Sequence, residues 1–361
     1  MTGKERVIAA LRREKADRVP IFMWFQPSTV RRLAEALEIA PNRVVEALGD
    51  DVRQAWVNNN YAMEGIRHAR EGEGHVDAWG IAWRRQGEFN QIVSFPLEKA
   101  SPDEILGYRF PVDAEDGLLD QMVPVMEWRD AYFCGVDVSP CVFEMYNRLR
   151  GMEGALLDLR ADEAVAFEMM GRCADFAVDL SHRACDRFDV DWLWTGDDVA
   201  GQQALFMSPE MWRRLVKPHL ERVVDVGIAR GLPVAYHSCG AIRDIIGDLI
   251  EIGVDVLNPI QCNCPGMEAA DLKREFGDLL TFMGGVDTQG LLPSGTANEV
   301  RRATATLIET MTSDGGGCIL AASHTVPPET PLDNIFAMYD EAGVATEEIL
   351  DRAAAIRARL P

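Results

Sequence analysis

Two residues that can bind metals or act as nucleophiles, His237 and Cys239, lie two positions apart in the sequence YHSCG. In an extended strand, residues i and i+2 point to the same face, so both side chains can reach one ion or one substrate group. Imidazole nitrogen and thiolate sulfur are donors that suit zinc. The pair therefore predicts a zinc site, and a buried histidine beside an inert core cysteine is the alternative.

This pair ends one of a series of predicted βα units. From about residue 190, short apolar runs alternate with helical patterns of period 3.6, which is typical of parallel strands joined by helices. The predicted strands in this half are 190–195, 232–237, 254–260, 279–284 and 318–324. The segments 18–25 and 131–138 are two further candidates in the first half. Together they predict a single-domain (β/α)₈ TIM barrel over residues 1–361.

The region of about 58–110 interrupts this pattern. Within it, 77–85 and 90–95 alternate like an antiparallel hairpin with Gly87 at the turn. We therefore expect an N-terminal helical and hairpin insertion in the barrel.

The last predicted strand offers two candidates for a third metal ligand, Cys318 at its beginning and His324 at its end. Six residues of strand rise about 20 Å, so the two cannot reach the same end of a barrel. Active sites of such barrels lie at the carboxyl ends of the strands. This rule selects His324 and places Cys318 in the core near the barrel floor.

Polar residues also follow the other predicted strands. They are Asp197, Asp198, Asn258, Gln261 and Asp287. We predict catalytic roles for the two neighbouring aspartates and the glutamine, and substrate binding for Asn258 and Asp287. For these last two, capping of the next helix is an equally good explanation. Trp24 and Trp194 are predicted to wall the substrate, and filling of the barrel core is the alternative for Trp194.

Composition excludes several partners. The formal net charge is −22 and no local basic patch is evident, so neither nucleic acid nor a membrane surface is expected as a partner. The first residues, MTGKERVIAALRREKADRVP, lack the apolar run of a signal peptide. Eight dispersed cysteines are typical of a reducing compartment. We expect a cytoplasmic enzyme without disulfides, and a homodimer remains open.

Several stretches resemble the uroporphyrinogen decarboxylase superfamily, specifically its corrinoid-dependent methyltransferase branch. The most specific are 196–218, 236–261, 282–301 and 315–342, and the sequence FEMYNRLRG around Glu144 is similar too. The resemblance covers most of the chain. It implies a (β/α)₈ barrel whose mouth receives a methyl donor and the corrinoid of a separate carrier protein.

The sequence departs from the family pattern at two places. Thiol-methylating members have a His-x-Cys pair and a distant third cysteine as zinc ligands, and here His324 aligns with the third position. The decarboxylases have an arginine-rich segment after the first strand, whereas this chain has FMWFQPSTV at 22–30. The sequence contains no Asp-x-His-x-x-Gly motif for corrinoid binding, so cobalamin is expected on a partner protein.

Three functions are compatible with this sequence. The first is transfer of a methyl group between a small methoxylated or methylated substrate and the corrinoid of a partner. There, zinc at the barrel mouth, or an acid such as Asp198 or Glu144, would stabilise the charge on the leaving group. The second is decarboxylation of a tetrapyrrole or a smaller carboxylic acid. The third is a non-catalytic metal- or corrinoid-binding protein.

Overall fold

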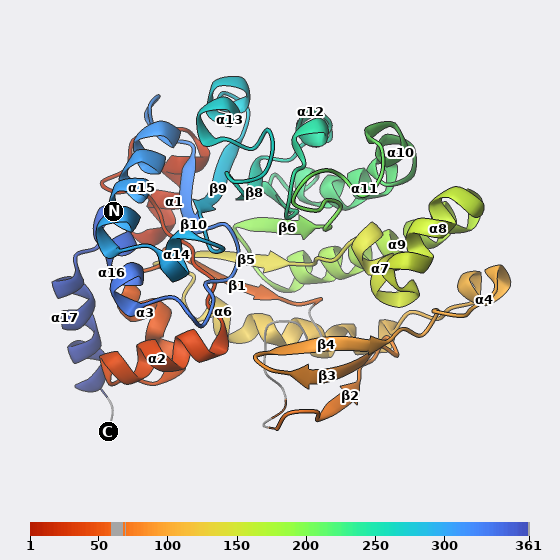
Figure 1. Ribbon diagram of the computed structural model, residues 1–361, viewed down its shortest axis with the longest axis horizontal. Helices are drawn as coiled ribbons and strands as arrows, with labels where there is room; N and C mark the ends of the chain where they lie inside the picture. Colours follow the sequence, from red (N-terminus) through yellow and green to blue (C-terminus); the bar gives the residue numbers. More distant parts are fainter. Residues whose placement is uncertain (59–67, 69, 360–361) are drawn as a thin grey trace. The chain divides into compact units, whose positions relative to one another are not determined.

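The computed structural model describes residues 1–58, 68 and 70–359. It is an α/β fold whose larger, parallel sheet has the order β1-β5-β6-β7-β8-β9-β10, while β2, β3 and β4 form a separate sheet (Figure 1). The chain divides into two compact units. Unit 1 comprises Met1–Arg53, Arg129–Phe133 and Val256–Pro361, and unit 2 comprises Gln54–Trp128 and Cys134–Asp255. The predicted parallel α/β architecture is confirmed, with seven rather than eight regular strands in the larger sheet of the described chain.

Unit 1 contains the last three strands of the larger sheet. They are β8 (Val256–Ile260), β9 (Thr281–Val286) and β10 (Cys318–Ala322), and β9 pairs in parallel with both neighbours. Its helices are α1 (Gly3–Leu11), α2 (Pro27–Leu37), η1 (Pro41–Arg43), α3 (Val44–Leu48), α13 (Ala269–Phe276), α14 (Leu291–Ser294), α15 (Ala297–Met311), α16 (Leu332–Glu341) and α17 (Thr346–Arg357). The strands are buried almost throughout, which explains their continuous apolar sequences.

The predicted first strand, 18–25, is not a regular strand. Instead, Ile21 and Phe25 form isolated parallel bridges with Leu320 and Val326, so this segment runs along β10. On its other side, the N–H of Asp51 donates to the carbonyl of Ile21 at 2.8 Å. The segment therefore has the position of a first strand, with too few consecutive pairs to count as one.

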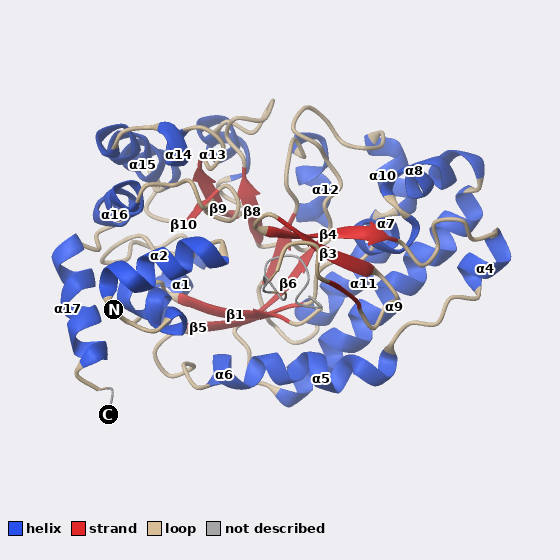
Figure 2. Ribbon diagram, turned by 60° about the horizontal axis from the view of Figure 1, so that its bottom comes forward, coloured by secondary structure: helices blue, strands red, loops and turns tan. Residues whose placement is uncertain are grey.

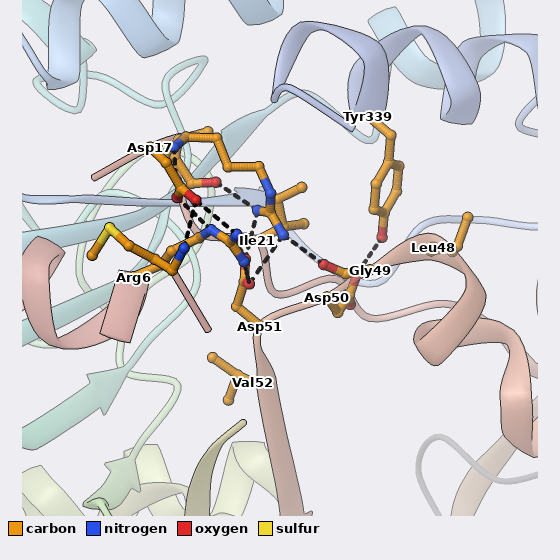
Figure 3. A network of polar contacts seen from close by, with 12 residues as sticks. Arg6, Asp17, Ile21, Leu48, Gly49, Asp50, Asp51, Val52 and Tyr339 are labelled. Carbon is orange, nitrogen blue, oxygen red and sulfur yellow. Dashed lines mark hydrogen bonds and ion pairs between the residues drawn. The ribbon is translucent and has the colours of Figure 1, made fainter. Parts of the chain in front are cut away.

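A buried carboxylate holds this segment in place (Figure 3). The side chain of Asp51 is 2% exposed and pairs with Arg18 at 2.6 Å and with Arg6 at 3.1 Å. It also accepts the N–H of Ile21 at 2.8 Å. Because a buried charge is costly unless it is paired and hydrogen-bonded, these contacts specify how the segment lies next to α1 and β10.

Unit 2 contains β6 (Trp192–Gly196) and β7 (Val234–His237), which pair in parallel with each other. Its helices are α4 (Pro102–Leu106), η2 (Val112–Ala114), α5 (Glu115–Leu119), η3 (Asp120–Met122), α6 (Val123–Met126), α7 (Phe143–Arg150), α8 (Met152–Ala161), α9 (Glu163–Arg187), α10 (Pro209–Leu215), α11 (Lys217–Ile228), η4 (Arg243–Ile245) and α12 (Ile246–Glu251). Ser208 caps α10 by accepting the N–H of Met211. Two more strands, β1 (Val52–Trp56) and β5 (Phe133–Asp137), contain residues of both units.

The region of the predicted insertion contains an antiparallel sheet of three strands rather than a two-stranded hairpin. They are β2 (Gly74–Val76), β3 (Ala82–Gln86) and β4 (Phe89–Ser94), and Figure 2 shows β3 and β4 side by side. The predicted turn lies where expected, since Gly87 has a φ of 62° between β3 and β4. Part of the predicted insertion, residues 59–67 and 69, lies outside the described residues.

Candidate functional site

His237 and Cys239 lie together at the carboxyl end of β7. The Sγ atom of Cys239 is 3.6 Å from Nε2 of His237, and both side chains are partly exposed. The next residue, Gly240, has a φ of 91°, and a Cβ there would lie 2.4 Å from the carbonyl oxygen of Gly201. Only glycine therefore allows the turn that follows Cys239.

Asp198 places a carboxylate next to this pair. Its Oδ1 atom accepts the N–H of Cys239 at 2.8 Å and lies 3.7 Å from Nε2 of His237. Its side chain is 38% exposed. Asp198 thus combines a structural contact with Cys239 and access to solvent.

Asp197 occupies a very different environment although it is the neighbouring residue. Its side chain is fully buried, and Oδ1 accepts the N–H groups of Val142 and Glu144 at the beginning of α7. Its Oδ2 atom has no hydrogen-bond partner in the described part of the chain. The pKa of Asp197 is raised to about 8, chiefly by burial and in smaller part by the nearby Glu144, although the backbone N–H groups oppose this rise.

Glu144 connects α7 to the end of β6. One carboxylate oxygen accepts the backbone N–H of Asp198 at 3.0 Å, and the other pairs with Arg148 at 2.6 Å. Because Asp197 also accepts the N–H of Glu144, the two carboxylates join the helix and the strand reciprocally. Both oxygens of Glu144 are therefore engaged in contacts that position its neighbours.

The remaining predicted polar residues lie in unit 1. Asn258, in the middle of β8, is 1% exposed, and Gln261, just beyond the end of β8, is 3% exposed. Asp287 accepts three backbone N–H groups, those of residues 289–291, so it does cap α14. His324 is exposed and lies two residues beyond Ala322, the end of β10. The predicted strand 318–324 was thus too long, because the chain turns after Ala322.

The aromatic residues differ in exposure. Trp24 is partly exposed and packs edge-on against Phe22, with ring centroids 5.7 Å apart. Trp194 is fully buried, next to Trp192, and its ring centroid lies 6.5 Å from that of His237. Trp194 therefore fills the core below the His237 ring, the alternative that its sequence position left open.

The family can be assigned directly. The family model described as uroporphyrinogen decarboxylase (URO-D) matches residues 135–343, more than half of the chain. The chain belongs to the uroporphyrinogen decarboxylase family. The matched region includes Glu144, Asp198, His237, Cys239 and His324.

Relatives of this uroporphyrinogen decarboxylase family member include methyltransferases. It is 20% identical over 351 residues to the methylcobamide:CoM methyltransferase MtbA of Methanosarcina mazei, covering 94% of this chain and 97% of that protein. It is 24% identical over 149 residues to the methylcobamide:CoM methyltransferase MtaA of Methanosarcina barkeri, covering 41% of this chain and 40% of that protein. A solved structure of a methyltransferase from Methanosarcina mazei matches with a TM-score of 0.72 at 16% identity, covering 95% of this chain and 98% of that one. This structural similarity confirms the TIM-barrel-like fold.

Sequence reasoning missed Arg148 in this family member. It is 5% exposed, pairs with Glu144 and lies 5.7 Å from the ring centroid of Trp56. The signal was present in FEMYNRLRG, where Glu144 and Arg148 have the i, i+4 spacing of a helical ion pair.

None of the described helices has the length and apolarity to cross a membrane.

Proposed function

We propose that this protein is a corrinoid-dependent methyltransferase that uses the His237–Cys239 pair at the end of β7. The observation that carries the proposal is the distance of 3.6 Å between the thiol and the imidazole, in a chain similar over nearly its full length to a methylcobamide:CoM methyltransferase. A thiol and an imidazole that leave one strand end together can bind one metal ion or one substrate group.

The residue types of this pair suit a zinc ion, and His324 is the third ligand that the sequence predicts. His237, Cys239 and His324 each offer one ligand atom, and this nitrogen and sulfur donor set suits zinc. A zinc ion with a position open to substrate would supply Lewis acidity for the sulfur or oxygen that gains or loses the methyl group. The chain's own contribution is to keep the thiol of Cys239 and the imidazole of His237 within reach of each other.

Three carboxyl groups take different roles in this proposal. Asp198, which contacts the Cys239 backbone and is exposed, is the candidate to exchange a proton with the reacting group. Asp197 and Glu144 hold the loop that carries Asp198. Gln261 would donate or accept a hydrogen bond at the substrate.

The substrate side of the proposal rests on residue types. Trp24 would provide an apolar wall for a small methylated or methoxylated compound, and the amide of Asn258 would orient it. Asp287 is assigned to the capping of α14, so a contact with substrate would come only from its remaining lone pairs. The corrinoid would arrive on a carrier protein, because the sequence lacks the Asp-x-His-x-x-Gly motif.

An assay of methyl transfer to and from cobalt tests this function. The full chain is mixed with methyl-cobalamin and small thiols, and separately with Co(I) cobalamin and methoxylated, methylthio or methylamine donors, and absorbance reports the methyl-cobalt bond. A corrinoid carrier protein is expected to react faster than free cobalamin, because docking raises the effective concentration of the cofactor. If no pair reacts while a carboxylic acid releases CO₂, the family's decarboxylase chemistry replaces the proposal.

Cys318 on β10 and His324 after its end should behave oppositely. His324→Ala is expected to lower methyl transfer by about a hundredfold or more, because it removes a proposed ligand. Cys318 is 3% exposed at the beginning of β10, so Cys318→Ala should cost only about 1 kcal/mol of unfolding free energy. Activity assays and thermal unfolding of both variants check this pair, and the opposite pattern would remove His324 from the site.

A further inference from the structure

We propose that Arg148 is a positioning residue that sets the geometry of Asp198 and Cys239 through Glu144. Its effect on methyl transfer rests on the proposed function, whereas its effect on the two loops does not. Its link to the two loops runs through Glu144, with which it forms an ion pair, and through Asp198, whose N–H Glu144 accepts.

The contacts form one continuous path. Arg148 pairs with Glu144 at 2.6 Å, and Glu144 accepts the N–H of Asp198 at 3.0 Å. Asp198 in turn accepts the N–H of Cys239 at 2.8 Å, and Cys239 lies 3.6 Å from His237. Each residue of this path therefore contacts the one before it, and the path begins at the buried guanidinium of Arg148.

Arg148 also contacts β1, through the ring of Trp56. Its guanidinium lies 5.7 Å from the ring centroid of Trp56, and Trp56 donates its indole N–H to the carbonyl of Ser139. Its charge also acts on Asp77: burial raises the pKa of that carboxyl group, and hydrogen bonds and then this arginine oppose the rise without cancelling it. Asp77 organises the turn between β2 and β3 by accepting N–H groups from that turn. Arg148 thus connects the insertion to the loops after β6 and β7.

Removal of this cation leaves Glu144 without its partner. The side chain of Glu144 is 13% exposed, and an unpaired carboxylate in such a place is expected to move toward water. The N–H of Asp198 then loses its acceptor, and the loop that presents Asp198 to Cys239 loosens. The change is local because the strands β6 and β7 keep their own ladder of hydrogen bonds.

Hydrogen exchange of the full chain tests this path without any substrate or metal. In Arg148→Met, amides of the segments 197–199 and 238–240 are expected to exchange about tenfold faster than in the wild type, while amides of α9 keep their rates. Arg148→Lys should restore part of the protection, because it keeps the charge beside Glu144. Arg148→Met should also lower the kcat of methyl transfer by about tenfold to a hundredfold, the usual range for residues behind a ligand.

A matched control separates positioning from general destabilisation. The control is Arg172, whose guanidinium donates hydrogen bonds to the carbonyls of Leu106 and Tyr108 and lies over the ring of Phe110. Arg172→Met should leave exchange in both loops unchanged. Unchanged loop exchange in Arg148→Met, or an equal increase in Arg172→Met, would overturn the proposal. If Arg148→Met does not fold, Arg148→Gln, which also removes the charge that pairs with Glu144, is measured in the same two segments, and wild-type exchange there would equally overturn the proposal.

Discussion

Cys239→Ala is expected to abolish metal binding and to lower methyl transfer about a thousandfold, while the fold survives. Loss of Lewis-acid stabilisation costs several kcal/mol, and about 1.4 kcal/mol corresponds to a factor of ten in rate. The fold should persist because the side chain of Cys239 is partly exposed beyond the last residue of β7, so its removal leaves no cavity in the core. Metal analysis of the purified protein, with about one zinc per chain expected in the wild type, checks the first part.

The control for this variant is another partly exposed cysteine. Cys185 lies on α9, and burial raises its pKa to about 11, so it should neither bind metal nor react. Cys185→Ala is expected to keep both the metal content and the rate. Zinc retained in Cys239→Ala would exclude Cys239 as a ligand, whereas zinc lost without loss of activity would separate the metal from the reaction.

The sequence predicted most of the parallel half of the fold because its signals are local. Ser208 before Pro209 starts a helix, and Gly231 and Gly253 end helices with positive φ values of 67° and 99°. The sequence did not predict the strand β1. VRQAW contains two polar residues, and only long-range contacts place such a segment in a sheet. Long-range contacts also decide the structure of 18–25. Its apolar sequence predicts a regular strand, but its contacts with Asp51, β10 and Val326 give it only isolated bridges.

The candidate site was predictable only where spacing decides the geometry. His237 and Cys239 are two residues apart at a strand end, and that spacing alone places them on one face. No such rule distinguishes Asp197 from Asp198, which are neighbours with the same side chain. The structure distinguishes them through α7. Asp197 accepts the N–H of Glu144, 53 residues away in sequence, whereas the side chain of Glu144 accepts the N–H of Asp198, 54 residues away. Such contacts between distant segments leave no periodic pattern in the sequence.

Asp197 has a consequence for stability that depends on pH. Its pKa is raised from 3.8 to about 8, chiefly by burial. Below about pH 4 the carboxyl group carries its proton in both the folded and the unfolded chain, so its ionisation does not lower the free energy of unfolding. Between about pH 4 and pH 8 the unfolded chain loses this proton and the folded chain keeps it, so the free energy of unfolding falls as the pH rises. Above about pH 8 Asp197 is ionised in both the folded and the unfolded chain, and the free energy of unfolding keeps the full reduction.

Asp197→Asn should therefore become more stable relative to the wild type as the pH rises from 4 to 8. An amide oxygen can still accept the N–H groups of Val142 and Glu144, and asparagine has no charge to bury. Each pH unit in this window is worth at most about 1.4 kcal/mol per proton, so the difference should reach several kcal/mol by pH 8. Urea unfolding of both proteins at half-unit steps of pH measures it, with Asp116→Asn, at a carboxylate whose side chain is 80% exposed, as the control. Parallel stability curves for Asp197→Asn and the wild type would mean that Asp197 is ionised in the folded protein at neutral pH, and the assignment of Asp197 as a neutral anchor of α7 would be wrong.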